Sequence, residues 1–143
     1  MGRVRPAEMI AVDTSAIVAI ILNEPERAAF RNAIQRVGKA LISTVSVIEV
    51  KMVVHGRRGA RAVVFVEDIL NLPMFEIVPP GVADMHAAYG AFIAFGKGSG
   101  HPARLNFGDV FSYALAKVRN LPLLYKGNDF AETDIQPAVA ASA

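Results

Sequence analysis

The sequence lacks several features that would place it in other classes of protein. Its 143 residues include no cysteine, which excludes disulfide bonds and thiolate metal sites and suits a reducing compartment such as the cytoplasm. No apolar run approaches the roughly 18 residues of a membrane-spanning helix. Residues 1–8 contain no apolar segment of the kind found in signal peptides. We therefore expect a cytoplasmic protein with no membrane partner.

An excess of charge of one sign is also missing. Lysine and arginine number 15 against 13 aspartates and glutamates, giving a net charge of +2. That balance allows a nucleic-acid partner without requiring one. Apolar residues make up 53% of the chain and charged residues 20%, which argues against a disordered protein. A chain of this length fits one domain with a substantial core.

The apolar pattern predicts strands that alternate with helices. Short apolar runs before polar turns indicate strands, and longer stretches with a 3.6-residue period indicate helices. The expected strands are residues 10–12, 40–42, 75–78 and 121–125, and the expected helices are residues 16–22, 25–37, 44–55, 60–72, 82–95 and 106–120. This order predicts an α/β fold whose central sheet is mostly parallel, has four or five strands and is covered on both faces.

The two ends of the chain differ in composition from the rest. Residues 1–8 carry two arginines and a proline, and we interpret them either as a mobile, disordered leader or as the result of an upstream start codon. Residues 9–135 are expected to form the single domain. Residues 136–143 form a tail of mostly small residues without an expected role in the core.

Four acidic residues stand where such a sheet would bring them together. Asp13 follows the first expected strand, Glu49 lies on the helix after the second, Asp109 opens the last long helix, and Asp129 follows the last strand. Ligands of open α/β sheets bind beyond the carboxyl ends of the strands. Clustered carboxylates repel each other, and a divalent cation removes that conflict. Oxygen ligands without cysteine or suitably spaced histidine favour Mg²⁺ or Mn²⁺.

Each acid also has a purely structural interpretation. Asp13 is a residue type that often caps a helix N-terminus, and Asp109 in a first helical turn complements the helix dipole. Asp129 has the alternative of a turn aspartate, and Asp134 is a weaker case of the same kind. The argument for a functional site therefore depends on the four acids as a set.

The residues around these acids form motifs in a recognisable order. They are Val12-Asp13-Thr14-Ser15, Ser43-x-x-Ser46-x-x-Glu49, Asn106-x-Gly108-Asp109-x-Phe111-Ser112-Tyr113-Ala114-Leu115-Ala116 and Leu124-Tyr125-Lys126-Gly127-Asn128-Asp129-Phe130-x-x-Thr133-Asp134. The set resembles the motifs of PIN-domain ribonucleases, and most closely those of the VapC toxins of bacterial toxin–antitoxin pairs. The resemblance spans residues 9–135 and implies a PIN-like three-layer α/β/α fold.

The resemblance also implies a function and roles for individual residues. It implies a Mg²⁺- or Mn²⁺-dependent endoribonuclease toxin that hydrolyses RNA phosphodiesters with metal-activated water. Such a toxin forms a homodimer and is silenced by a cognate VapB-like antitoxin. Asp13 and Asp109 match the main metal ligands, and Glu49 and Asp129 match the acids that act directly or through metal-bound water. Ser15 matches a hydroxyl that supports the first acid.

The position of Glu49 on its helix allows two interpretations. It shares a helical arc with Val45, Ile48 and Met52, so it is either an inward carboxylate bound to a cation or a partly exposed glutamate at the rim.

The helices expected over residues 44–55 and 60–72 are apolar nearly all round, so they must be buried or cover an interface. Burial in the core is one interpretation, and a groove for an antitoxin helix is the other. The residues concerned are Val47, Val50, Val53, Val54, Val63, Val64, Phe65 and Val66.

Candidate RNA contacts flank the glycine-rich loop before the last helix or follow the last strand: Lys97, His101, Arg104 and Lys126. They are interpreted as contacts to RNA phosphates or, alternatively, as ordinary surface charges. A second cluster, Arg57, Arg58 and Arg61, is interpreted as solvated. None of the three histidines is expected to bind a metal.

Two alternative functions stay open on the sequence. One is a PIN nuclease that processes RNA outside any toxin–antitoxin pair, and the other is a non-catalytic PIN-like module that binds RNA or protein. Metal-dependent cleavage of labelled RNA separates the enzyme from the binding module. A phosphate-binding P-loop motif is absent, and Ser15 stands where an aspartyl-phosphate phosphatase would need a second acid.

Overall fold

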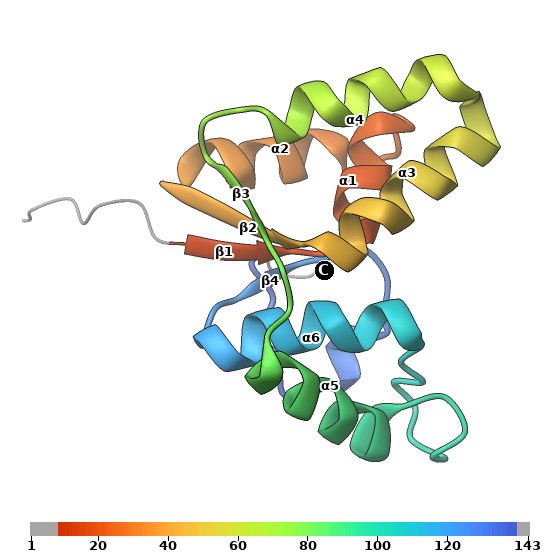
Figure 1. Cartoon of the computed structure of the whole chain (residues 1–143), viewed down its shortest axis with the longest axis vertical. Helices are drawn as coiled ribbons and strands as arrows, with labels where there is room; N and C mark the ends of the chain where they lie inside the picture. The colour runs from red at the N-terminus through yellow and green to blue at the C-terminus, as the bar shows by residue number, and fades with distance from the viewer. Residues whose placement is uncertain (1–8, 140–143) are drawn as a thin grey trace, which may run out of the picture.

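The computed structural model describes residues 9–139, so the predicted leader and residues 140–143 of the tail lie outside the described part. Its sheet contains β1 (Met9–Val12), β2 (Lys39–Ser43), β3 (Phe75–Val78) and β4 (Leu123–Leu124). All neighbouring strands are parallel, in the order β3-β2-β1-β4 (Figure 1). The chain moves outward from β1 to β3 and then crosses to the other side of β1. The strand order therefore reverses between β1 and β4.

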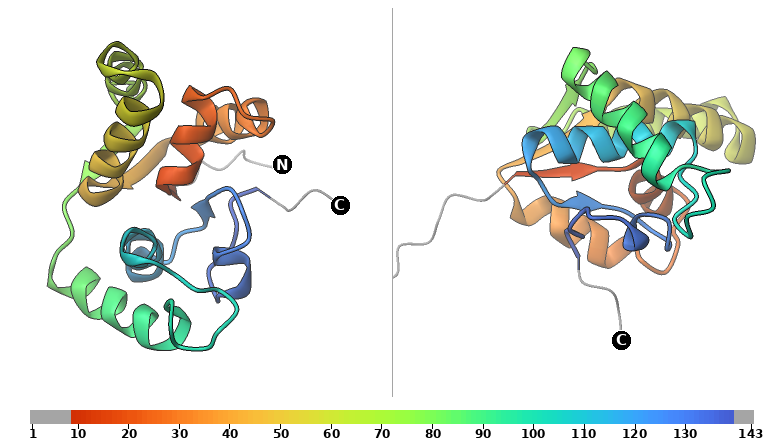
Figure 2. Two further views of the ribbon diagram at one scale, coloured as in Figure 1. Left: turned by 90° about the vertical axis from the view of Figure 1, so that its right-hand side faces the viewer. Right: turned by 90° about the horizontal axis from the view of Figure 1, so that it is seen from below.

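Within residues 9–139, six α-helices cover the sheet in two groups (Figures 1 and 2). One face carries α1 (Thr14–Ile21), α2 (Arg27–Arg36), α3 (Thr44–Arg58) and α4 (Val63–Leu70), and the other carries α5 (Val82–Phe95) and α6 (Phe107–Arg119). Two short 3₁₀ helices are η1 (Ala60–Ala62) and η2 (Phe130–Glu132). The predicted three-layer α/β/α fold is confirmed. None of the described helices is long and apolar enough to cross a bilayer.

Successive residues of each strand point to opposite faces of the sheet and pack into two separate apolar cores. Val12 and Ile42 are register partners and pack under α1 to α4, while Ala11 and Leu41 are partners and pack under α5 and α6. All four residues are at most 5% exposed. Because the strands are covered on both faces, they read in the sequence as continuous apolar runs.

The end of the chain differs from the prediction. Pairing in the last strand is limited to Leu123–Leu124, instead of residues 121–125. Leu123 also bonds on its free edge, where its N–H donates to the Gln136 carbonyl and its carbonyl accepts from the Ala138 N–H. Ala138 and Val139 pack against the core. The expectation that the tail has no core role is therefore wrong for these two residues.

The buried face of α3 was predicted incorrectly. The helix buries Ser46 and Val50, whereas Ile48 and Met52 are 53% and 67% exposed. Glu49 lies half-buried at the boundary between these faces, so the interpretation that it shares an inward arc with Ile48 and Met52 is wrong. A helix that is apolar on nearly every side gives no direction by periodicity. The predicted helix over residues 60–72 is also shorter, as η1 followed by α4.

The buried face of α6 is not marked by its large apolar side chains alone. Phe107 and Val118 are apolar, yet they are 75% and 42% exposed. Gly108 and Ser112 are buried in their place. Small residues on this face let α6 approach the sheet and α3 closely, which matters for the acids described below.

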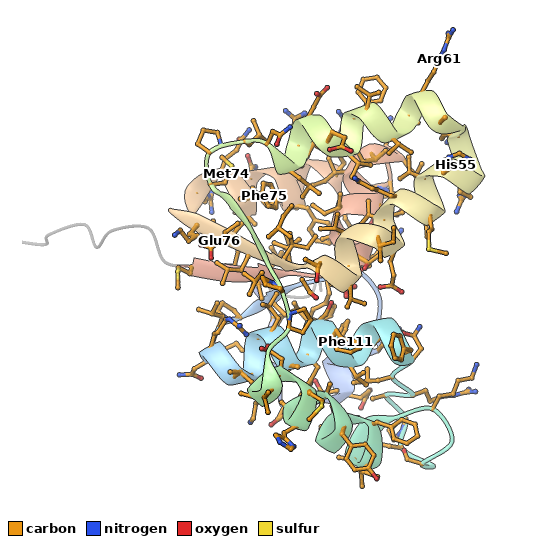
Figure 3. The ribbon with its side chains drawn as sticks, viewed as in Figure 1. His55, Arg61, Met74, Phe75, Glu76 and Phe111 are labelled. Atoms are coloured by element: carbon orange, nitrogen blue, oxygen red, sulfur yellow. The ribbon has the colours of Figure 1, made fainter. Side chains whose placement is uncertain are left out.

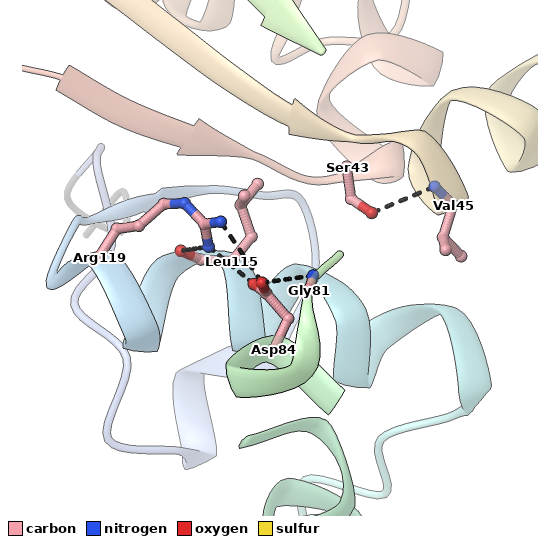
Figure 4. Close-up of polar contacts among 6 residues, drawn as sticks. All are labelled: Ser43, Val45, Gly81, Asp84, Leu115 and Arg119. Carbon is pink, nitrogen blue, oxygen red and sulfur yellow. Dashed lines mark hydrogen bonds and ion pairs between the residues drawn. The ribbon is translucent and has the colours of Figure 1, made fainter. Parts of the chain in front are cut away.

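A buried ion pair joins α5 to α6 (Figure 4). Asp84, in the first turn of α5, accepts a hydrogen bond from the Gly81 N–H at 2.9 Å. The guanidinium of Arg119, at the end of α6, donates to Asp84 Oδ1 at 2.7 Å and to the Leu115 carbonyl at 3.3 Å. The Asp84 side chain is only 7% exposed. This contact fixes the start of α5 against α6, the helix that carries Asp109.

Candidate active site

The four predicted acids lie around the carboxyl ends of β1 and β4, where the strand order reverses. Asp13 follows β1 directly and Asp129 follows β4, while Glu49 projects from α3 and Asp109 from the first turn of α6. Asp109 lies close enough to the other three acids for their negative charges to raise its pKa. The structure therefore brings the four together, at the kind of switch point where α/β proteins bind ligands.

Asp13 is 4% exposed and is held by neutral donors. Its Oδ2 accepts from the Ser15 N–H at 3.0 Å and from the Ser15 hydroxyl at 2.6 Å, and its Oδ1 accepts from the Ser112 hydroxyl at 2.5 Å. The bond from the Ser15 N–H caps α1, so the structural interpretation of Asp13 holds as well. Among residues 9–139, no lysine, arginine or histidine forms an ion pair with Asp13. A buried carboxylate without a cation is costly.

Glu49 is placed by a hydroxyl on one side and a glycine on the other. Its Oε1 accepts from the Thr14 hydroxyl at 2.8 Å. Its carboxylate lies against Gly108, where any β-carbon would overlap it. Burial raises the pKa of Glu49, the Thr14 hydrogen bond lowers it, and the charge of Asp13 raises it further. Any larger residue at position 108 would therefore displace the Glu49 carboxylate from this position.

Asp109 caps the start of α6 and also lies near the other three acids. It forms a capping box with Asn106, in which the Asp109 N–H donates to Asn106 Oδ1 at 2.9 Å and the Asn106 N–H donates to Asp109 Oδ2 at 3.0 Å. Burial raises the pKa of Asp109 to about 7, and the neighbouring acids add to the rise while the Asn106 bond opposes it. The raised pKa therefore reflects first the burial of this carboxyl group and then the charges of the neighbouring acids.

The two acids near the end of the chain, Asp129 and Asp134, differ in their contacts. Asp129 is exposed and directly precedes η2 without capping it through its side chain. Asp134 accepts from the Tyr113 hydroxyl at 2.7 Å and forms an ion pair with Lys117, also at 2.7 Å. Asp134 therefore ties the end of the chain to α6, and its structural interpretation is the one that the contacts support.

The chemistry of the donor set fits a hard divalent cation, because every candidate ligand is a carboxylate oxygen. The side chains are not closed around a single point, however. Within the described residues, no three acidic or histidine side chains are arranged to hold an ion as they stand. Glu49 is turned to Thr14 and Asp109 to Asn106.

Lys126, a predicted RNA contact, is engaged within the chain. Its ammonium lies 3.0 Å from Glu24 and 3.4 Å from Glu26. Its backbone N–H donates to the Ser15 hydroxyl at 2.9 Å, and that hydroxyl in turn donates to Asp13. Lys126 thus connects the end of β4 to the support of the first acid.

The loop that leads into α6 holds one of its basic side chains and leaves two exposed. His101 Nδ1 accepts from the Ala103 N–H at 3.0 Å, and its ring meets Phe95 edge-on at 5.0 Å. Lys97 and Arg104 are exposed and form no ion pair with the described residues. Of the predicted RNA contacts, these two are available to a ligand.

The second basic cluster lies at the far end of α3. Arg57 and Arg58 are exposed, and Arg61 extends away from the molecule (Figure 3). Its interpretation as a solvated cluster is confirmed.

Three hydroxyls that hold the acids were not assigned from the sequence: Thr14, Ser46 and Ser112. Ser46 and Ser112 are both fully buried, and their oxygens lie 3.1 Å apart. Ser46 precedes Glu49 by three residues, and Ser112 follows Asp109 by three. Residues spaced by three lie on the same side of a helix, so the spacing to the acids was the signal that could have found them.

Comparisons with known proteins identify the relatives of this chain. A family model described as PIN domain matches residues 10–136. Ribonuclease VapC28 of Mycobacterium tuberculosis is 40% identical over 128 residues, which cover 90% of this chain and 96% of the relative. Ribonuclease VapC42 of the same species is 38% identical over 127 residues, with 89% and 97% covered.

Solved structures of similar fold point the same way. VapC20 of Mycobacterium tuberculosis, a sarcin–ricin-loop-cleaving toxin, superposes with a TM-score of 0.70 at 19% identity and covers 90% of this chain and 99% of its own. VapBC-1 of nontypeable Haemophilus influenzae gives 0.65 at 20% identity, with 90% and 95% covered. These likenesses establish the fold, and the family match and sequence relatives establish the rest. This chain belongs to the PIN-domain family and, within it, to the VapC ribonucleases.

Proposed function

We propose that this VapC-type ribonuclease toxin is a Mg²⁺- or Mn²⁺-dependent endoribonuclease whose cation is held by Asp13, Glu49, Asp109 and Asp129. The observation that carries the proposal is the meeting of these four acids at the switch point of the sheet. Two observations support it: buried Asp13 forms no ion pair within residues 9–139, and burial together with the charges of the three other acids raises the pKa of Asp109.

The four acids have different places in the proposed site. Asp13 and Asp109 are the main ligands, and Glu49 and Asp129 act directly or through water. When bound, the cation activates a water molecule and stabilises the charge on the phosphodiester under attack. Lys97 and Arg104 hold phosphates of the RNA beside the site. The proposed substrate makes the cytoplasm the place of action.

Cleavage of a labelled RNA tests this function. We expect cleavage with Mg²⁺ or Mn²⁺, none with EDTA, and recovery when Mn²⁺ is added back. Asp13→Asn should be inactive although its circular dichroism matches the wild type. Asp134→Asn is the matched control, because Asp134 contacts Lys117 and Tyr113 instead of the site. Cleavage that resists EDTA, or wild-type cleavage by Asp13→Asn, would contradict the proposal.

We also propose a VapB-like antitoxin as partner, as in the toxin–antitoxin complexes among the structural neighbours. A groove of about 420 Å³ between α1, α2 and α4 suits the apolar face of an antitoxin helix. Its lining includes Ile20, Ile34 and Phe65, and also Arg27. The Nε of Arg27 is buried and has no hydrogen-bond partner in residues 9–139, so a partner that supplies a carbonyl or carboxylate would satisfy it.

The groove assignment predicts which of two neighbouring side chains matters. Phe65 lines the groove and is 61% exposed, whereas Val64 beside it is 57% exposed and does not line it. Phe65→Asp should therefore abolish co-purification with the antitoxin encoded beside the toxin gene, and Val64→Asp should leave it intact. Equal behaviour of the two variants would rule out this groove.

A homodimer is the third part of the proposal. A second apolar groove, of about 460 Å³, lies over α5 and the start of α6 and includes Met85, Tyr89 and Phe92. These three side chains are 49% to 67% exposed. An apolar surface of this kind is typical of an interface between subunits. Light scattering should give twice the mass of one chain for the wild type and the mass of one chain for Tyr89→Glu. Val118→Glu, at an exposed position on α6, is the control and should stay dimeric.

A further inference from the structure

Two hydroxyls are buried directly behind the first acid. Ser46 on α3 and Ser112 on α6 are both 0% exposed, and their oxygens lie 3.1 Å apart. Ser112 also lies 2.5 Å from Asp13 Oδ1. The three groups form one chain of contacts from α3 through α6 to the end of β1, inside the protein.

The direction of these hydrogen bonds follows from the number of protons. Each serine hydroxyl carries one proton, and an ionised carboxylate can only accept. The Ser112 proton is therefore directed at Asp13, and Ser46 must be the donor in the contact between the two serines. Donation from Ser46 polarises the Ser112 hydroxyl and strengthens its bond to Asp13.

The two oxygens of Asp13 are left in different states. Among the contacts within residues 9–139, Oδ2 accepts two hydrogen bonds from Ser15, whereas Oδ1 accepts one, from Ser112. A carboxylate oxygen has two lone pairs, so Oδ1 keeps one of them for another partner. Ser15 and Ser112 grip the carboxylate from opposite oxygens and fix its rotation.

The hydroxyl pair also aligns the helices that carry the other acids. Ser46 lies opposite Ser112, and Glu49, three residues later, lies against Gly108, four residues earlier. The two helices therefore pass each other in opposite directions, with small residues at both contacts. Ser46 lies about one helical turn before Glu49 on α3, and Ser112 lies about one turn after Asp109 on α6.

We propose that Ser46 and Ser112 are a positioning pair, which orients Asp13 so that Oδ1 alone is presented to the divalent cation. This inference rests on the proposed metal-dependent function and adds the residues that prepare its first ligand. Groups that hold a metal ligand in place commonly change metal affinity by about 10- to 100-fold when they are removed. Ser112 acts on Asp13 directly, and Ser46 acts through Ser112.

Mn²⁺ affinity, measured by calorimetry on the full-length protein, tests the pair. Ser112→Ala should raise the Mn²⁺ dissociation constant by about tenfold or more. Ser46→Ala should raise it by less, because Ser112 still donates to Asp13. Cleavage by Ser112→Ala should be weak at limiting Mn²⁺ and should recover largely at saturating Mn²⁺, because the other ligands are unchanged.

Ser43→Ala is the matched control for the loss of a buried hydroxyl. Ser43 is 1% exposed, and its hydroxyl accepts from the Val45 N–H to cap α3 (Figure 4). Its loss should lower the melting temperature in EDTA without changing Mn²⁺ affinity. The proposal is overturned if Ser112→Ala binds Mn²⁺ like the wild type, or if Ser43→Ala weakens binding as much as Ser112→Ala. Failure of the wild type to bind Mn²⁺ would instead remove the proposed function, and the positioning role with it.

Discussion

Two aspartates are buried at the starts of helices in this protein, and they differ in what neutralises them. Asp84 on α5 is 5% exposed, and Asp13 before α1 is 4% exposed. Asp84 meets the guanidinium of Arg119 at 2.7 Å, whereas the partners of Asp13 in the described part of the chain are the N–H and hydroxyl donors of Ser15 and Ser112. The two carboxylates are therefore almost equally buried, and they differ in the charge of the groups that contact them.

The electrostatic consequences of the two arrangements are opposite. Burial on its own would raise the pKa of Asp84, but the hydrogen bonds from Arg119 and Gly81 outweigh it and hold this pKa below its usual value. Around Asp13 the near charges are other acids, and their effect is visible in the pKa of Asp109, which burial and charge repulsion raise to about 7. The α5–α6 junction is complete as it stands, while the acidic edge is suited to an external cation.

Exchange of each aspartate for asparagine should give the largest effects. Asp13→Asn should affect RNA cleavage, and Asp84→Asn should affect stability. Asp13→Asn should abolish RNA cleavage and change the free energy of unfolding by less than about 1 kcal/mol, because the amide keeps the shape of the cap. Asp84→Asn should keep cleavage per folded molecule but cost about 2 kcal/mol of stability. That is below the usual cost for a fully buried pair, because the Arg119 side chain is 25% exposed.

Urea unfolding and a cleavage assay on the same preparations measure both quantities. An Asp13→Asn variant that unfolds several kcal/mol more easily would mean that Asp13 is as structural as Asp84. Loss of cleavage in folded Asp84→Asn would mean that the ion pair reaches the site after all. Either result would break the distinction between the two regions.

Gly108→Ala should give the next largest effect, because it displaces an acid without removing one. A β-carbon at this position overlaps the Glu49 carboxylate. Displacement of a reacting or binding group by about 1 Å commonly costs about a hundredfold in rate. Gly56→Ala in α3 is the matched control, since its β-carbon meets nothing within 4 Å and alanine favours a helix. Cleavage by Gly108→Ala at the Gly56→Ala level would show that the position of Glu49 is unimportant.

The pH dependence of stability tests the raised pKa of Asp109. Asp109 has a pKa raised from 3.8 to about 7, so the folded state binds more protons than the unfolded state between these values. Stability without metal should therefore fall as pH rises from about 4 to about 7. Thermal melts in EDTA should show this fall for the wild type and a smaller one for Asp109→Asn. At pH 7.5, Mn²⁺ at about 100 times its dissociation constant should restore about 2.7 kcal/mol. Parallel curves of stability against pH for the wild type and Asp109→Asn would contradict the raised pKa of Asp109.

The smallest effect is expected from the basic side chains near the acidic edge. Lys97 and Arg104 form no ion pair with residues 9–139, whereas Lys126 is paired with Glu24 and Glu26. Lys97→Ala and Arg104→Ala should each weaken binding of single-stranded RNA and reduce the slope of log affinity against log salt by about 0.7. Lys126→Ala should change this slope less. Titrations with the inactive Asp13→Asn background at several salt concentrations decide between these expectations.

The sequence allowed the three-layer fold, its parallel sheet and the four acids to be predicted, because these depend on apolar periodicity and on acids that follow strands. The buried face of α3 could not be predicted, because a helix with valine on nearly every side has no distinct apolar face. For the same reason the sequence left two orientations open for Glu49, inward or partly exposed at the rim, and the structure shows it half-buried. The packing of Ala138 and Val139 was missed because small residues carry little apolar signal.

The supporting hydroxyls were harder to predict for a different reason. Serine is common at caps and turns, so Ser46 and Ser112 carried no signal on their own. Their role depends on a contact between α3 and α6, and the sequence does not state which helices touch. The pairing of Asp84 with Arg119 is unpredictable in the same sense, since 35 residues separate them.

The acidic edge is held by contacts between the first and last parts of the chain. Ser112 bonds to Asp13 across 99 residues, and Lys126 bonds to Ser15 across 111. During synthesis the ribosome releases Asp13 and Glu49 well before Asp109 and Asp129 exist. With the proposed assignment of the four acids, the cation site is incomplete until the part of the chain that follows β4 has been synthesised.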